Sequence, residues 1–255
     1  MSGIEYQLDS SGIATLAVNR PEVRNALDWE AMESFADTLR RAAKTKDLRA
    51  LIVTGRGNSF IAGGDMKALA PFDSRRDGLR LSRLMGKALE RLHGLPCPTI
   101  AAINGPARGG GAEIAVACDL RVMARDANIG FVQATLGIAT GWGGARYLLQ
   151  MIGYPRTLEL LATGRILPAE EAKQLGLADH LAEPGGALEA AYELARQMAQ
   201  HPVEAVRAAK RLLRYALTAP LFARPAERRL FASLWASDFK RKIVSERFLH
   251  NKPKG

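Results

Sequence analysis

This sequence is poor in the side chains that usually form disulfides and metal sites. Among its 255 residues there are only two cysteines and four histidines. Cys97 and Cys118 form no metal or redox pattern, so we expect small buried thiols in a reducing compartment rather than a disulfide. The histidines stand far apart without the spacing of metal ligands, and we therefore expect no metal site.

Long apolar runs are also missing, and we expect no N-terminal targeting segment. No apolar run is long enough to span a bilayer, and residues 1–5 lack the basic start of a signal peptide. The chain is 47% hydrophobic and 24% charged, which is ordinary for a globular protein with a sizeable core. We expect a cytoplasmic protein with no membrane partner.

Common glycine motifs of nucleotide-binding proteins and hydrolases are absent. Gly109 and Gly111 are followed by Ile114 where a dinucleotide fingerprint needs its third glycine, and no lysine follows a glycine run as in a P-loop. Residues 57–61 fail the last position of a serine-hydrolase elbow. The glycines of this chain therefore serve another purpose.

The most informative segment that is present covers residues 101–113. It reads as an apolar strand, a turn of three glycines, and a helix whose first turn carries Glu113. Glycines permit a close approach and leave amides free to face a developing negative charge, and the helix start adds partial positive charge. Glu113 follows Gly110 by three residues, so both can face one pocket. The segment predicts an oxyanion site beside an acid or base, although a plain strand-to-helix turn has the same pattern.

A second glycine turn favours the functional interpretation. Gly63 and Gly64 follow the apolar strand predicted over residues 50–55. Two turns that each end a parallel strand can supply one amide apiece to a single oxygen.

Five motifs follow one another along this chain. In order they are residues 19–27, Ala62-Gly63-Gly64-Asp65, residues 104–113, residues 117–121, and residues 163–165 with 169–177. In order and spacing they resemble the motifs of the enoyl-CoA hydratase/isomerase family, also called the crotonase family. The resemblance covers nearly the whole chain and implies an α/β fold, a crotonase-like spiral of ββα units with mainly parallel sheets and a C-terminal helical trimerisation region. It implies a spiral core with the acyl-CoA site over residues 1–194 and a helical oligomerisation region over 195–255.

The resemblance implies an enzyme that acts on an acyl-coenzyme A thioester and needs no further cofactor, since coenzyme A is part of the substrate. The amides of Gly64 and Gly110 would hold the thioester oxygen as negative charge grows on it, and Glu113 would act as acid and base. The family also implies a homotrimer or a dimer of trimers. Further substrate contacts are implied for Ala62, Gly63, Asp65 and Gly109, and contacts with the nucleotide end for Arg24, Phe248 and Lys252.

One departure from the family concerns its second catalytic glutamate, whose place is taken by Gln133. Glutamine can orient a water molecule, but it cannot exchange a proton in this pH range. No aspartate or glutamate occurs between Asp126 and Glu159, so no local acid replaces it. Glu113 would work alone, or a distant carboxylate such as Asp65, Asp73 or Asp77 would assist.

These residues leave three functions open. The leading interpretation is an enoyl-CoA hydratase or a related lyase or isomerase that works through an enolate. The alternative is a decarboxylase of a malonyl-type acyl-CoA, which needs no base to form the enolate; residues 131–138 with 142–144 resemble that branch, but an ionised Glu113 would repel the substrate carboxylate. A third possibility is a catalytically silent acyl-CoA-binding protein.

The net charge of +10 is concentrated near the C-terminus, where residues 201–255 hold 13 Lys and Arg against 4 Asp and Glu. The basic residues alternate with apolar ones, as in amphipathic helices with one buried face. We expect a solvated basic face, with coenzyme A phosphates as the alternative partner. No stacking motif accompanies the charge, so we expect no nucleic-acid partner.

Strands and helices are predicted to alternate along the chain, which favours right-handed crossovers around a mainly parallel sheet. Residues 67–78 are expected to form a loop. Strands are predicted at residues 13–18, 49–54, 99–104 and 120–124, and helices at 29–44, 79–92, 113–117, 144–152 and 169–175, followed by a helical tail from about residue 195.

Overall fold

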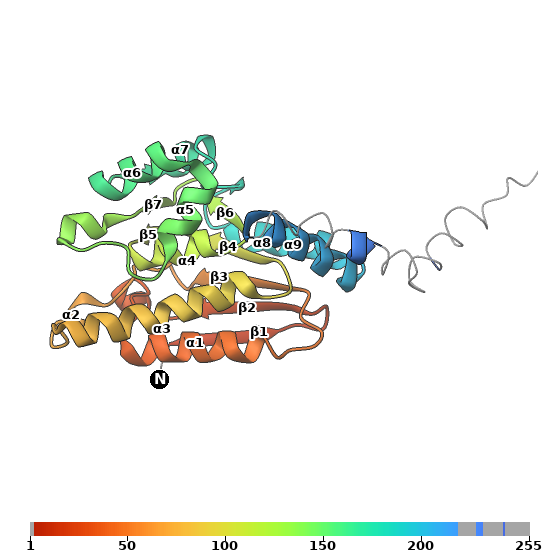
Figure 1. The fold of residues 1–255 in the computed structure, drawn as a ribbon, viewed down its shortest axis with the longest axis horizontal. Coiled ribbons are helices and arrows are strands. Elements are labelled where there is room, and N and C mark those ends of the chain that lie inside the picture. Colours follow the sequence, from red (N-terminus) through yellow and green to blue (C-terminus); the bar gives the residue numbers. More distant parts are fainter. Residues whose placement is uncertain (1–2, 219–227, 232–241, 243–255) are drawn as a thin grey trace, which may run out of the picture.

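The computed structural model describes residues 3–218, 228–231 and 242, and its main element is a six-stranded sheet with the order β1-β2-β3-β4-β6-β9 (Figure 1). β1 and β2 pair antiparallel, and every other neighbouring pair in this sheet is parallel. The strands are β1 (Ile4–Leu8), β2 (Ile13–Val18), β3 (Ala50–Gly55), β4 (Thr99–Ile103), β6 (Leu120–Ala124) and β9 (His180–Ala182). The predicted α/β class with a mainly parallel sheet is confirmed.

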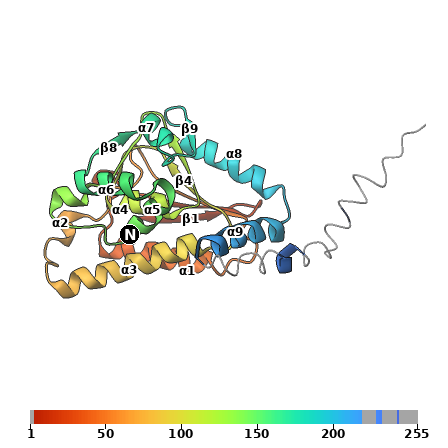
Figure 2. The same cartoon turned by 45° about the horizontal axis from the view of Figure 1, so that its top comes forward.

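Both faces of this sheet are buried, which explains why its central strands are almost continuously apolar. Alternate side chains of β2 and β3, such as Leu16 and Val53, join the core beneath α1 (Trp29–Ala42) and α3 (Arg75–Gly94). The intervening side chains face α8 (Ala187–Ala199), whose Ala191 and Ala195 are fully buried against them. Figure 2 shows α8 on the opposite side of the sheet from α1 and α3.

A smaller sheet carries the second half of the chain. β5 (Ala107–Arg108) pairs parallel with β7 (Asn128–Gly130), and β7 pairs antiparallel with β8 (Ile166–Pro168). Around the two sheets lie α2 (Met66–Leu69), α4 (Gly110–Ala117), α5 (Gly144–Ile152), α6 (Tyr154–Thr163), α7 (Ala169–Gln174), α9 (Val203–Thr218) and the 3₁₀ helices η1 (Pro21–Val23) and η2 (Val132–Leu136). No helix in the described ranges is both long enough and apolar enough to cross a membrane.

Several predicted boundaries need correction. α4 starts at Gly110, three residues before the predicted start at Glu113. The predicted loop over residues 67–78 contains most of α2 and the first turn of α3, because Asp65 and Ser74 each cap a helix N-terminus with a side-chain oxygen. The predicted division between residues 194 and 195 lies inside α8, whose buried alanines pack on the sheet on both sides of it.

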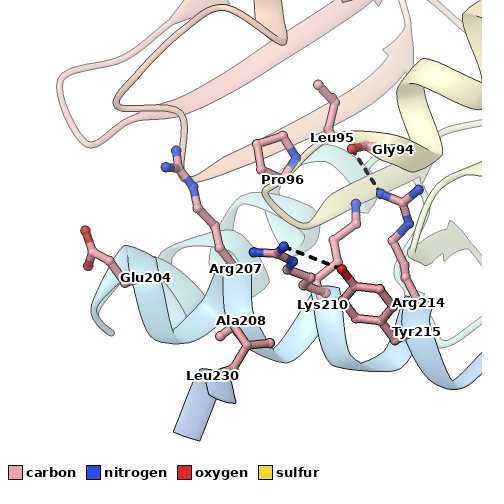
Figure 3. Close-up of a pocket in the computed structure, with 11 residues that line it drawn as sticks. Gly94, Leu95, Pro96, Glu204, Arg207, Ala208, Lys210, Arg214, Tyr215 and Leu230 are labelled. Atoms are coloured by element: carbon pink, nitrogen blue, oxygen red, sulfur yellow. Dashed lines mark hydrogen bonds between the residues drawn. The ribbon is translucent and has the colours of Figure 1, made fainter. Parts of the chain in front are cut away.

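Helix α9 is attached to the amino ends of the central strands rather than presenting a purely solvated basic face. Lys210 is buried, and its Nζ donates to the main-chain oxygen of Cys97 at 2.8 Å and to Asp119 Oδ2 at 2.6 Å. Arg207 donates to the main-chain oxygens of residues 46 and 48, and Arg214 donates to that of Gly94 (Figure 3). The segment predicted to form trimer contacts beyond Thr218 lies largely outside the described residues.

Candidate active site

The two predicted glycine turns meet at the carboxyl ends of β3 and β4. Gly63 adopts φ +89°, and a Cβ atom placed on it would lie 2.9 Å from the amide nitrogen of Gly110. Gly109 adopts φ +51°, and its amide donates to the main-chain oxygen of Gly130 at 2.9 Å. Glycine is favoured at Gly63 and Gly109 because other side chains strain the left-handed region, and at Gly63 a Cβ atom would also crowd the Gly110 amide. The structure thus brings the two turns together, as their positions after parallel strands predict.

The amide of Gly64 points away from the extended segment around Leu27, with which the first glycine turn pairs. Leu27 N donates to Gly63 O at 2.8 Å, and Leu27 O accepts from Asp65 N at 2.9 Å. In such a parallel bridge the residue between the two bonds directs its own N–H and C=O to the opposite side. Gly110 is the first residue of α4, so its amide has no acceptor within the helix. Neither amide has a hydrogen-bond acceptor in the part of the chain described here.

Two asparagines hold the segment that leads into the first turn. Asn25 is fully buried with φ +60°, and its Nδ2 donates to the main-chain oxygens of Arg56 and Ser59 at 2.9 and 2.8 Å. Asn104 Nδ2 donates to Gly57 O at 2.8 Å, and its Oδ1 accepts from Thr54 Oγ1 at 3.3 Å. Both asparagines lie in motifs on which the family resemblance rests, yet their positioning role depends on contacts distant in sequence.

Glu113 is 1% exposed, and its carboxylate accepts four hydrogen bonds. Oε2 accepts from Trp142 N at 3.0 Å and from Gly144 N at 2.8 Å, and Oε1 accepts from Gln133 Nε2 at 2.9 Å and from Gly141 N at 3.3 Å. Gly144 is the first residue of α5, and the preceding Gly143 has no side chain to cap the helix. The carboxylate therefore supplies the missing cap and places a negative charge at a helix N-terminus.

The protonation of Glu113 reflects two opposing influences. Burial raises the pKa of this carboxyl above its ordinary value, while the backbone donors of residues 144, 142 and 141 and the Gln133 amide lower it; burial prevails. A carboxylate has about four lone-pair positions, and all four are used here. In this arrangement Glu113 has no free lone pair for a substrate proton.

Gln133 lies on η2 beside both Glu113 and the glycine turn. It is 7% exposed, and a Cβ atom placed on Gly109 would lie 3.9 Å from its Cδ and Nε2 atoms. Its Nε2 donates to Glu113, whereas its buried Oε1 receives no hydrogen bond from any residue that the structure describes. Asp65, a possible distant carboxylate, is instead engaged as the N-cap of α2.

Trp142 was not predicted as part of the oxyanion region. Its side chain is 5% exposed, and a Cβ atom on Gly110 would overlap its six-membered ring. Gly144 is also necessary, because a Cβ atom there would lie 2.5 Å from Glu113 Cγ. The indole thus forms an apolar wall beside the Gly110 turn, and burial of the site favours strong electrostatic interactions there.

The structure describes two of the four remaining predicted contacts, Arg24 and Ala62. Arg24 is exposed in the left-handed conformation with φ +53°, after η1. Ala62 is half-buried in the first turn. Phe248 and Lys252 lie outside the described residues, so their roles remain predictions.

A cavity of about 620 Å³ lies elsewhere, between α9 and the residues that precede β4 (Figure 3). It is lined by residues 94–96 and by side chains of α9, including Arg207, Lys210 and Arg214. Those three side chains already donate hydrogen bonds to the protein. This cavity is at the amino end of β4, whereas the glycine turns are at its carboxyl end.

Comparisons with known proteins agree on one family. The model of the family "Enoyl-CoA hydratase/isomerase" matches residues 9–252. An ethylmalonyl-CoA decarboxylase of Gallus gallus is 32% identical over 96% of this chain and 83% of its own length. An enoyl-CoA isomerase/hydratase, fer4, of Mycosarcoma maydis is 38% identical over 78% of this chain and 76% of its own length. The crystal structure of an enoyl-CoA hydratase from Bacillus anthracis superimposes with a TM-score of 0.90 at 29% identity, covering 95% of each chain.

Proposed function

This chain belongs to the enoyl-CoA hydratase/isomerase family, and from that premise we propose that it binds an acyl-coenzyme A thioester with the carbonyl oxygen between the amides of Gly64 and Gly110. Two main-chain donors that have no acceptor among the described residues, on turns that touch, support this assignment. Such donors stabilise an oxygen that gains negative charge, and removing one from an oxyanion site costs about 3 kcal/mol or more. The function is therefore the stabilisation of a thioester enolate.

The reaction that this geometry favours is decarboxylation of a malonyl-type thioester. The observation that carries the proposal is the four-donor environment of Glu113, which leaves the carboxylate no free lone pair with which to remove a proton. Decarboxylation needs no base. The bond between C2 and the substrate carboxyl carbon breaks, its electron pair forms the enolate, carbon dioxide leaves, and C2 then takes up one proton.

The repulsion expected between Glu113 and a substrate carboxylate is reduced by the same contacts. Four N–H groups and the N-terminus of α5 face the Glu113 charge and compensate it within the protein. The relative named ethylmalonyl-CoA decarboxylase gives independent support.

Hydration or isomerisation of a 2-enoyl thioester is the second candidate. It is supported by the direct contact of Glu113 with Gln133 in a buried position, and by the relative named enoyl-CoA isomerase/hydratase. For this reaction the carboxylate must first exchange one of its protein donors for the water molecule or the substrate proton.

The test is turnover of malonyl-type and 2-enoyl coenzyme A thioesters, followed by mass spectrometry. The Gly110→Pro variant removes the proposed donor, while its matched control Gly110→Ala adds a Cβ atom against Trp142 but keeps the amide. Proline is tolerated at the first helical position, where Gly110 lies. We expect carbon dioxide release that is lower in Gly110→Pro than in Gly110→Ala by about 100-fold or more.

The other outcomes of the turnover experiment distinguish the remaining candidate functions. Water addition without carbon dioxide release would select the hydratase candidate. Equal and measurable activity of the two Gly110 variants would reject the amide as an oxyanion donor, whereas loss of activity in both would report the overlap of Cβ with Trp142. Thioester binding without turnover of either class would reject both reactions and leave a binding protein.

A further inference from the structure

The side-chain oxygen of Gln133 is a buried acceptor without a donor among the described residues. The residue is 7% exposed, so bulk solvent does not reach this atom freely. Leaving a buried hydrogen-bonding group unsatisfied costs about 1–3 kcal/mol. An oxygen in this state is a binding position for a group that carries an O–H or N–H.

The direction of this oxygen is determined by Glu113. Gln133 Nε2 donates to Glu113 Oε1 at 2.9 Å, and Glu113 already holds three main-chain donors. If the Gln133 amide were turned over, its oxygen would face the carboxylate, and two acceptors would oppose one another. The carboxylate therefore keeps the amide in one orientation, with Oε1 directed away from Glu113.

The amide group that carries this acceptor lies beside the proposed oxyanion turn. The Gln133 side chain is within van der Waals distance of a Cβ position on Gly109, the residue immediately before the Gly110 amide. The acyl carbon next to a thioester carbonyl held by Gly110 must also lie within a few bond lengths of that amide.

We infer that Gln133 Oε1 positions the water molecule that protonates the enolate carbon; this inference rests on the proposed decarboxylation. One O–H of the water donates to Gln133 Oε1, and the other is directed at C2. A thioester enolate is a stronger base than hydroxide, so the transfer is favourable. The new C–H bond forms, the water O–H bond breaks, and the hydroxide takes a proton from solvent, so the sum consumes one proton and releases one carbon dioxide.

The same arrangement explains how Gln133 and Glu113 can complete the reaction although neither of them acts as an acid. Gln133 neither gives nor takes a proton, and Glu113 is saturated by donors, so neither side chain needs to titrate during turnover. Because a single acceptor fixes the water on one face of the enolate, the proton arrives from one side. In D₂O, a substrate with one alkyl substituent at C2 therefore gives one stereoisomer of the product that carries deuterium at C2.

The experiment uses the full-length protein with a 2-alkylmalonyl coenzyme A thioester in D₂O. It measures the rate of carbon dioxide release and the ratio of the two C2 stereoisomers of the deuterated product. Gln133→Met keeps the length of the side chain but removes the acceptor. The matched control is Thr157→Val, which removes another buried oxygen that has no partner in the described chain, on α6 and outside the site.

We expect wild-type protein and Thr157→Val to deliver deuterium to one face. In Gln133→Met the ratio of the two stereoisomers should fall by about tenfold, because the free energy of one hydrogen bond corresponds to a change of about that size. The rate of carbon dioxide release should change much less. A merely structural role of Gln133 would lower the rate and leave the stereochemistry unchanged.

The results separate this inference from the function on which it rests. A racemic product from wild-type protein, or an unchanged ratio in Gln133→Met, would overturn the water site while carbon dioxide release still supports the decarboxylase. If Gln133→Met does not fold, Gln133→Leu provides the same test. Absence of carbon dioxide release from wild-type protein would instead reject the decarboxylase itself, and the water site with it.

Discussion

Replacement of Glu113 should affect the stability of the protein through the four donors that it accepts. In Glu113→Ala these donors lose their acceptor. The amides of Trp142 and Gly144 belong to buried residues and make the shorter main-chain bonds, at 3.0 and 2.8 Å. Two unsatisfied buried amides at about 2 kcal/mol each give a loss of about 4 kcal/mol. Removing a buried charge offsets part of this, so we expect a net loss of about 3 kcal/mol.

Glu113→Gln should lose much less stability, because the donor and the acceptor of the hydrogen bond with Gln133 can exchange roles. The new side-chain oxygen can accept from Trp142 and Gly144, while its amide group replaces Oε1. Gln133 can then turn over and present its own oxygen to that amide. The longer bond from Gly141 N, at 3.3 Å, has no replacement, so we expect a loss of about 1 kcal/mol.

Urea unfolding followed by circular dichroism measures both losses as shifts of the midpoint at an unchanged slope. Glu22→Ala serves as the control, since Glu22 is an exposed glutamate on η1. If Glu113→Ala unfolds at the wild-type midpoint, the cap that the Glu113 carboxylate forms on α5 contributes nothing to the stability of the protein. If both Glu113 variants lose equal stability, the proposed reversal of the Gln133 amide is wrong.

Four further predictions follow from individual contacts. Burial raises the pKa of Glu113, so uptake of its proton stabilises the folded state; this contribution to the free energy of unfolding is complete below the ordinary pKa of 4.5 and is lost as pH rises through the raised pKa. Urea unfolding from pH 4 to 7 should therefore show the stability of the wild-type protein falling relative to that of Glu113→Gln. A constant difference between the two proteins would contradict this. Gly144→Ala should lose about 1–3 kcal/mol in the same assay because its Cβ atom would lie 2.5 Å from Glu113 Cγ, whereas wild-type stability would refute the close contact. Burial raises the pKa of Cys97 to about 11, so iodoacetamide at pH 8 should alkylate it only after unfolding, as mass spectrometry of native and denatured samples can establish. Lys210→Met should lose about 3 kcal/mol because Asp119 remains without its cation; thermal unfolding measures the loss, and an unchanged midpoint would show that the pair contributes nothing.

Much of the fold could be predicted because its signals are local or ordered along the chain. The strand at residues 13–18 and the helix at residues 144–152 have the predicted bounds, and the crotonase-like fold implied by the order of the motifs is confirmed. The short strands β5, β7 and β8 contain two or three residues each, which is too few to display a period. They exist because they pair with one another, and pairing is not visible in any single segment.

The candidate site likewise contains features that the local sequence predicts and features that depend on distant contacts. The glycine turns could be found because glycine at a strand end has a local conformational reason. The saturation of Glu113 could not, because its main-chain donors lie 28 to 31 residues farther along the chain and come from peptide groups that every residue possesses. Asp65 has a structural role that its motif did not reveal, since its side chain caps α2, and its contact with substrate stays a prediction.

The attachment of α9 has a consequence for how this protein can change during evolution. Arg207 and Arg214 donate to main-chain oxygens, so the residues that supply these oxygens can be substituted without loss of the acceptor, provided that the backbone path is kept. Sequence drift in the connections before β3 and β4 is therefore tolerated, whereas the basic positions of the helix are constrained. A C-terminal helix from a homologue that carries both arginines and the lysine that pairs with Asp119 at the same spacing could be transplanted onto this core without redesign of the loops that receive it.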